Sequence, residues 1–132
     1  MPDYSTLSPS EVNALVAERW FGPKPEDGTV YLDDTPGWTW YIVAGQGLFW
    51  HPDDFCSDPV AGDRLEQRMV EHGLIVISER WIDRTHCAVG YADRNRAPFA
   101  HARDPERGVA LSLCALRAWD ALHGETGGED GN

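Results

Sequence analysis

The chain has 132 residues, 42% of them hydrophobic, and a net charge of −11, which predicts one globular domain over residues 1–124 with a single core. It holds no apolar run of the roughly 18 to 20 residues that a membrane-spanning helix needs, and its first residues do not resemble a secretory leader. Three widely spaced cysteines without a Cys-x-x-Cys pair favour reduced thiols in a cytoplasm over a disulfide framework or a zinc site.

The segment 8–21 carries the signals of an amphipathic helix. Ser8 suits the N-cap, Pro9 the first helical position, and Glu11 can close a capping box with Ser8. Hydrophobic residues then recur at helical spacing, and a Gly-Pro pair follows. We expect this helix to pack against the core.

The middle of the chain predicts a loop and a hairpin. Residues 23–37 are rich in Pro, Gly and Asp, which is typical of a long loop, with at most a short edge strand over 29–32. Aromatic and β-branched residues over 38–43 predict a strand. The turn at 45–47 leads back into a second strand over 48–50.

A second helix is predicted from Asp58 as N-cap and Pro59 as first residue to a stop at Gly73. The segment His51 to Cys56, which precedes it, places an imidazole, two carboxylates and a thiol close together. Its spacing matches no metal motif, and one loop supplies no distant ligand. We therefore expect a loop and a helix cap there, without a metal.

The second half predicts further strands. Residues 74–82 and 85–92 are typical of two strands joined by the two-residue turn Asp83-Arg84, and 98–102 of a third. His86 and Cys87 are adjacent in such a strand and point to opposite faces, so His86 cannot activate Cys87. We expect no catalytic residue, no cofactor and no enzymatic activity.

The last helix is expected to start at Asp104-Pro105 and to run to about Leu122, with a disordered Gly-rich and acidic tail over 125–132. It is apolar nearly all round. Such a helix is either wedged between two layers of the protein or shared with a second subunit, so a homo-oligomer contact through 105–122 is one of two interpretations.

The elements together predict an α+β fold, with an antiparallel β-sheet layered with three helices in an α-β-α sandwich-like arrangement. The order is helix, hairpin, helix, strands and helix. Six tryptophans are many for this length, and most are expected in the core. If Trp38 and Trp40 share a face, one surface of the hairpin is free for a partner.

Three segments carry a resemblance to a known family: residues 11–18 of the first helix, the aromatic-small-small-Asp entry at 55–58, and the stretch 100–102 followed by 111–118. Over roughly residues 7–120 the chain resembles the phage ABA sandwich domain family. The resemblance implies helices layered with an antiparallel sheet, and an origin in a phage or prophage acting in the cytoplasm of an infected or lysogenic bacterium. It implies no activity and no catalytic residue.

Our leading hypothesis is a small non-enzymatic phage accessory protein that binds a host protein and antagonises antiviral defence. An acidic surface that imitates nucleic acid would attract a host defence component that binds nucleic acid, without direct contact to nucleic acid or a membrane. The first half of the chain supplies the candidate residues for this surface, which are Asp33, Asp34, Asp53, Asp54 and Asp63.

Two alternatives stay open. The protein could sequester a nucleotide signal, with guanidinium groups on phosphate and an aromatic side chain on the base. The arginines for this purpose are Arg80, Arg84, Arg94, Arg96 and Arg103. A role as a structural or assembly protein of the phage is the other alternative.

Overall fold

The structure is a computed structural model, and it describes residues 4–30, 35–92 and 97–123. A short 3-10 turn, Tyr4–Thr6, precedes α1, Pro9–Val16, which continues as one π-helical turn, η2, Ala17–Phe21. Ser8 and Glu11 form the predicted capping box, and Gly22 ends the helix with a φ of 125°. The first helix is confirmed.

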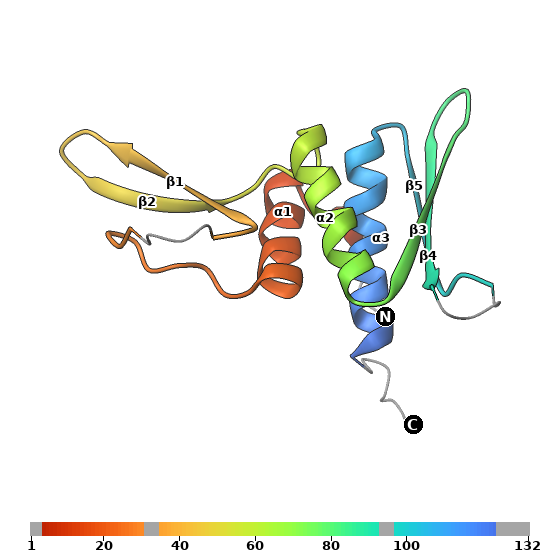
Figure 1. The fold of residues 1–132 in the computed structure, drawn as a ribbon. Helices are drawn as coiled ribbons and strands as arrows, with labels where there is room; N and C mark the ends of the chain where they lie inside the picture. Colours follow the sequence, from red (N-terminus) through yellow and green to blue (C-terminus); the bar gives the residue numbers. More distant parts are fainter. Residues whose placement is uncertain (1–3, 31–34, 93–96, 124–132) are drawn as a thin grey trace.

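The arm is our name for the hairpin of β1, Trp38–Val43, and β2, Gly47–Pro52. The two strands pair antiparallel from Trp38↔Pro52 to Val43↔Gly47, as predicted. Thr29 and Val30 form no strand, and the rest of the edge strand expected at 29–32 lies outside the described residues. Figure 1 shows the arm projecting from one side of the helices.

The remaining elements follow the predicted order. Helix α2, Pro59–Glu71, begins at the Asp58 cap, and three antiparallel strands come after it: β3, Leu74–Arg80; β4, Thr85–Tyr91; and β5, Ala100–Asp104. Their order in the sheet is β3-β4-β5. The α+β class with three helices and antiparallel strands is confirmed, with two small sheets in place of one.

Two boundaries differ from the prediction. The β3–β4 connection spans Trp81 to Arg84, and within it the Trp81 N–H donates to the Arg84 carbonyl at 2.7 Å. Helix α3, Arg107–Leu122, starts after Glu106 and not at Asp104. Asp104 pairs with Thr85 as the last residue of β5, so the sheet holds its backbone out of the helix.

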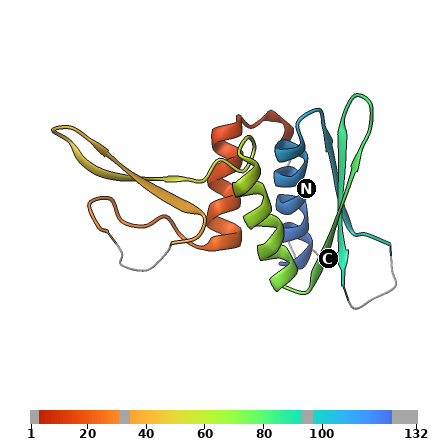
Figure 2. The same cartoon turned by 45° about the horizontal axis from the view of Figure 1, so that its top comes forward.

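The layers of the molecule follow from where α3 lies. Helices α1 and α2 cover one side of α3, and the β3-β4-β5 sheet covers the other (Figures 1 and 2). No described element covers the outer face of that sheet. Residues 110–116 of α3 are all buried. Within the single chain this helix therefore lies between two layers, as the first of the two interpretations has it. A contact of this helix with a second subunit stays a prediction.

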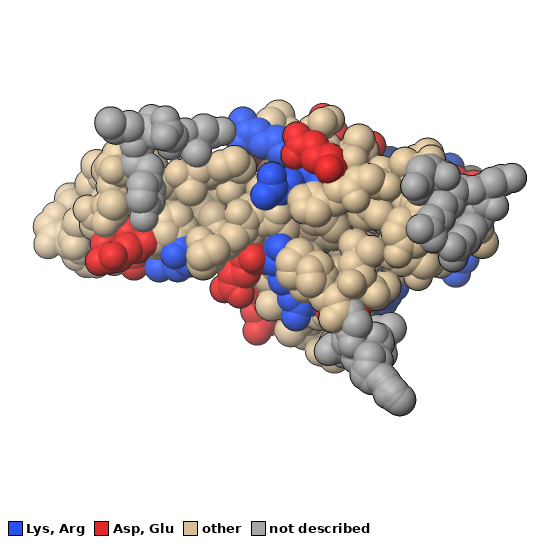
Figure 3. Space-filling view, turned by 60° about the horizontal axis from the view of Figure 1, so that its bottom comes forward, with Lys and Arg blue, Asp and Glu red and all other residues tan. Residues whose placement is uncertain are grey.

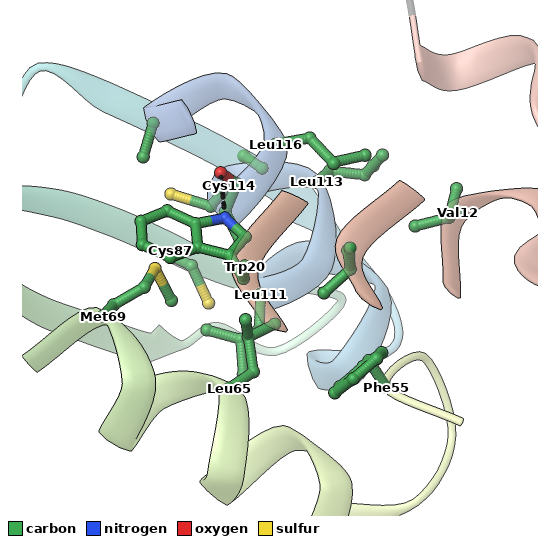
Figure 4. Packing of buried hydrophobic residues seen from close by; sticks show 14 of the residues in the cluster. Val12, Trp20, Phe55, Leu65, Met69, Cys87, Leu111, Leu113, Cys114 and Leu116 are labelled. Atoms are coloured by element: carbon green, nitrogen blue, oxygen red, sulfur yellow. Dashed lines mark hydrogen bonds between the residues drawn. The ribbon is translucent and has the colours of Figure 1, made fainter. Parts of the chain in front are cut away.

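The core gathers side chains from every layer (Figure 4). Trp20 donates its indole N–H to the Ala115 carbonyl at 3.0 Å and meets Trp119 edge-on. Leu65 and Met69 from α2 and Cys87 from β4 pack around the same helix. Within the described residues, no helix is both long and apolar enough to cross a membrane.

Candidate binding surface

Two tryptophans anchor the arm to the body of the protein. Trp38 and Trp50 are each only 6% exposed. The Trp38 indole N–H donates to the Gly22 carbonyl at 3.1 Å, and that of Trp50 to the Thr29 carbonyl at 2.9 Å. The base of the arm is thereby held by the loop that follows η2.

The outer edge of β2 is covered by the same loop. The Gly28 N–H donates to the Leu48 carbonyl at 2.9 Å, and the Trp50 N–H donates to the Asp27 carboxylate at 3.0 Å. This backbone hydrogen bond, aided by Lys24, lowers the pKa of Asp27. Asp27 is therefore ionised at neutral pH, and its carboxylate joins the loop to β2 by accepting from the Trp50 N–H.

The outer edge of β1 carries free backbone groups. The Asp53 N–H donates to the Gly37 carbonyl, and because backbone groups alternate in an antiparallel ladder, those of Trp40 and Ile42 point away from β2. No described strand pairs with this edge, and no backbone bond reaches these two residues on that side. The edge can therefore accept another strand.

The arm is also exposed and uncharged. Trp40 is 45% exposed, Tyr41 44% and Ile42 68%, and no residue from 38 to 52 is Asp, Glu, Lys or Arg, in a chain with 25% charged residues. Tyr41 lies against Phe49 and His51 on the other face of the hairpin. The end formed by the arm, at the left of Figure 3, presents mostly uncharged atoms.

A groove of about 490 Å³ lies at the base of the arm, between α2 and the residues Phe21 and Pro36. Its apolar part is Phe21, Pro36 and Val60, and α2 lines the rest with charged and polar side chains. Arg68 crosses the groove wall, with its Nε donating to the Trp20 carbonyl at 2.8 Å and its guanidinium over the Phe21 ring. Only Gly37 separates Pro36 from Trp38, the first residue of β1, so groove and edge adjoin.

Of the residues predicted for an acidic surface, Asp53 is buried, whereas Asp54 and Asp63 are exposed, and the acidic surface as a whole stays a prediction. Asp53 is 9% exposed and accepts from the Thr39 hydroxyl at 2.5 Å, so it belongs to the interior and not to an open face. Asp54 accepts from the Asn13 amide, and Asp63 lies 3.8 Å from Arg107. Asp33 and Asp34 lie outside the described residues.

The predicted arginine group is partly brought together. Arg84 and Arg103 both lie over the Trp81 ring, at 5.9 and 5.2 Å from its centroid. Arg84 is already bound by both carboxylate oxygens of Asp83. Arg80 is exposed without an ion pair, while Arg94 and Arg96 lie outside the described residues.

The histidines and cysteines are separated, as expected for His86 and Cys87. His86 bridges Glu79 and His101 on the outer face of the sheet, at 3.0 and 3.2 Å, whereas Cys87 is fully buried against α3. Burial raises the pKa of the Cys87 thiol and that of Cys114, the latter to about 12. In the described ranges, no three His, Cys, Asp or Glu side chains lie where they could hold a metal ion.

Sequence reasoning named one face of the hairpin as a possible surface for a partner, but it chose charged residues elsewhere as the candidate site. The available signal was the absence of any charged residue over 38–52 in so acidic a chain. The hairpin was predicted, but its projection from the body is a tertiary property.

No protein-family model, no curated protein and no solved structure matches this chain. The resemblance to the phage ABA sandwich domain family stays a prediction.

Proposed function

We propose that this chain is a non-enzymatic protein-binding protein whose arm pairs with an extended segment of a partner protein. The observation that carries the proposal is the free edge of β1 at Trp40 and Ile42, in the middle of an exposed, uncharged surface. An extended peptide added to such an edge gains main-chain hydrogen bonds, and side-chain pockets supply its specificity.

The composition of the arm supports this mode of binding. Charged residues are depleted and aromatic residues enriched at the centres of protein interfaces. Natural edge strands are usually protected from pairing by lysine, proline or a bulge, and β1 has none of these between Trp38 and Val43. The absence of this protection supports the proposal that a partner strand covers the edge of β1.

The groove supports a binding surface for the partner that continues beyond the arm. A strand paired with β1 and extending past Trp38 would reach Pro36 and the groove beside α2. Phe21 and Val60 offer it apolar contact, and the charged side chains of α2 offer both signs of charge. We propose that the partner presents a strand followed by an amphipathic segment. The hypothesis that this partner is a host defence protein rests on the family resemblance alone.

The test is a capture experiment with matched variants. The tagged chain carries a photo-crosslinking residue at Phe49, beside the edge strand, and the crosslinked partner from a bacterial lysate is identified, purified and titrated. The double substitution W40K/I42K places charge on the free edge and should weaken binding of that partner by tenfold or more. The control is I77K, because Ile77 is 44% exposed on β3, in the other sheet.

The outcome distinguishes specific binding at the β1 edge from non-specific hydrophobic binding. I77K should bind as the unsubstituted chain does, and both variants should keep the unsubstituted circular dichroism spectrum. Equal affinity of W40K/I42K and the unsubstituted chain for the purified partner would contradict the proposal.

A further inference from the structure

A further free strand edge lies in the other sheet, on β3. The Ala92 N–H donates to the Gly73 carbonyl at 3.0 Å, so in the register of β3 with β4 the odd-numbered residues of β3 bond to β4. Backbone groups alternate along an antiparallel strand, and those of Val76 and Ser78 therefore point away from β4. No described strand pairs with them on that side, and no other backbone hydrogen bond reaches them there.

This edge lacks the usual protection against pairing. Lysine and proline are absent from β3, and its register with β4 runs without a bulge. Its two charged residues, Glu79 and Arg80, stand together at its end and have opposite signs. The edge is therefore neutral in a chain with a net charge of −11, so two copies of this acidic chain can approach each other along it.

Exposed apolar side chains flank the edge on the outer face of the sheet. The Ser78 hydroxyl lies 3.5 Å from the Cys87 thiol on the inner face, and side chains alternate along a strand, so Ile75 and Ile77 lie on the outer face. They are 47% and 44% exposed, and no described element covers them. Both are positioned for contact with a strand that pairs with β3.

An exposed apolar side chain also flanks the edge on the inner side, on α2. Figures 1 and 2 place α1 on one side of α2 and β3 on the other. Arg68 faces the first of these sides, because its Nε donates to the Trp20 carbonyl in η2. Val70 lies about 200° further round the helix, on the side of β3, and it is half exposed.

We propose that β3 pairs with β3 of a second copy of this chain, antiparallel and about a two-fold axis, so that the two sheets join into one. A two-fold contact uses the same patch on both copies, which an antiparallel pair of identical strands satisfies. An axis beside Ile77 sets Val76 opposite Ser78 of the second copy and Glu79 opposite Ile75. Like charges are thereby kept apart, and the α2 helices of both copies lie on the same side of the joined sheet.

The proposal does not depend on the arm. The β1 edge and the β3 edge belong to different sheets, which lie on opposite sides of the helices (Figure 1). The chain can therefore bind its partner through β1 and a second copy through β3 at the same time.

The test is sedimentation equilibrium of the full chain at concentrations up to about 100 µM, where a dimer should be present. The substitution S78P removes a backbone N–H that points to the free edge and none that bonds to β4, a position where an edge strand tolerates proline. It should weaken the dimer tenfold or more while the circular dichroism spectrum stays that of the unsubstituted chain.

A pair of charge variants at the axis tests the contact without proline. I77K and I77E should each weaken the dimer tenfold or more, because like charges then face each other across the axis. An equimolar mixture of the two should form a mixed dimer at least tenfold tighter than either variant alone. The matched control is I42K on the arm, where Ile42 is also exposed, and it should leave the dimer unchanged.

Three results would overturn the proposal. The first is a chain that stays monomeric at about 100 µM. The second is a dimer that S78P and I77K leave intact, which would place the contact on another surface such as α3. The third is a dimer lost in I42K, which would place it on the arm. I77K should still bind the partner of the arm, so the failure of this proposal and that of the proposed function are distinguishable.

Discussion

At the residue scale, the polar signals at helix starts were predictable wherever the chain was free to follow them. Ser8 and Asp58 cap α1 and α2 as predicted, with side chains that accept from the first-turn N–H groups. Asp104 carries the same Asp-Pro signal and fails as a cap, because β4 pairs with it in the sheet. The Asp104 carboxylate still accepts from the Glu106 N–H. Its preference for bonding to a backbone N–H two residues on is therefore satisfied in the turn just before α3.

The three buried cysteines predict a loss of stability in alkali. Burial raises the pKa of Cys56, Cys87 and Cys114 above the ordinary 9.0, that of Cys114 to about 12. Above pH 9 the unfolded chain loses thiol protons that the folded chain keeps, so the free energy of unfolding should fall as pH rises towards 12. The measurement is urea denaturation from pH 8 to 11.

The control for the alkaline loss is C114A. Removing this thiol should make the fall with pH shallower by up to about 1.4 kcal/mol per pH unit, whatever the substitution does to stability at pH 8. An unchanged slope would show that Cys114 does not contribute.

At the element scale, the position of α3 depends on how closely other segments of the chain pack against it. An apolar pattern on nearly all sides predicted that the helix is covered, but not by what. Its first turn packs on the loop before α2 so tightly that a Cβ at Gly108 would lie 2.2 Å from the Cys56 carbonyl oxygen. Only glycine allows this contact of α3 with the Phe55-Cys56 segment, and no sequence period signals it.

The substitution G108A should therefore destabilise the fold by about 1–3 kcal/mol, the usual cost of overpacking against fixed backbone. The matched control is G62A in α2, where a Cβ would meet its nearest atoms at an ordinary 3.6 Å. G62A should be neutral or stabilising by up to about 1 kcal/mol, because alanine restricts the unfolded chain. Urea denaturation midpoints measure both, and a G108A midpoint at or above that of G62A would refute the close contact.

At the scale of the whole molecule, the arm is held by far fewer packing contacts than the body, which is the three helices and the β3-β4-β5 sheet. The body buries α3 between two layers, while the arm is a two-stranded hairpin anchored by Trp38 and Trp50 with both faces partly in water. Two-stranded hairpins are marginal without a third strand or a helix against them. Stability should therefore differ between the two sheets.

Native-state hydrogen exchange should show this difference. The amides that join β1 to β2, such as those of Tyr41 and Phe49, should exchange at least tenfold faster than those of the central strand β4, because the arm can open without breaking the core. Slow exchange in the arm, equal to that of Val89 in β4, would mean that arm and body open as one unit. In the presence of the partner, the arm should become protected.

The sequence by itself determined the elements of this protein, because capping residues, Gly-Pro stops and hydrophobic periods act over a few neighbouring residues. It predicted the hairpin, the order of helices and strands, and the opposite orientation of His86 and Cys87. Only the tertiary structure decided which layer lies next to which, that Asp53 is buried, and that the edge of β1 is free. These outcomes depend on segments far apart in the chain that meet only when the core closes.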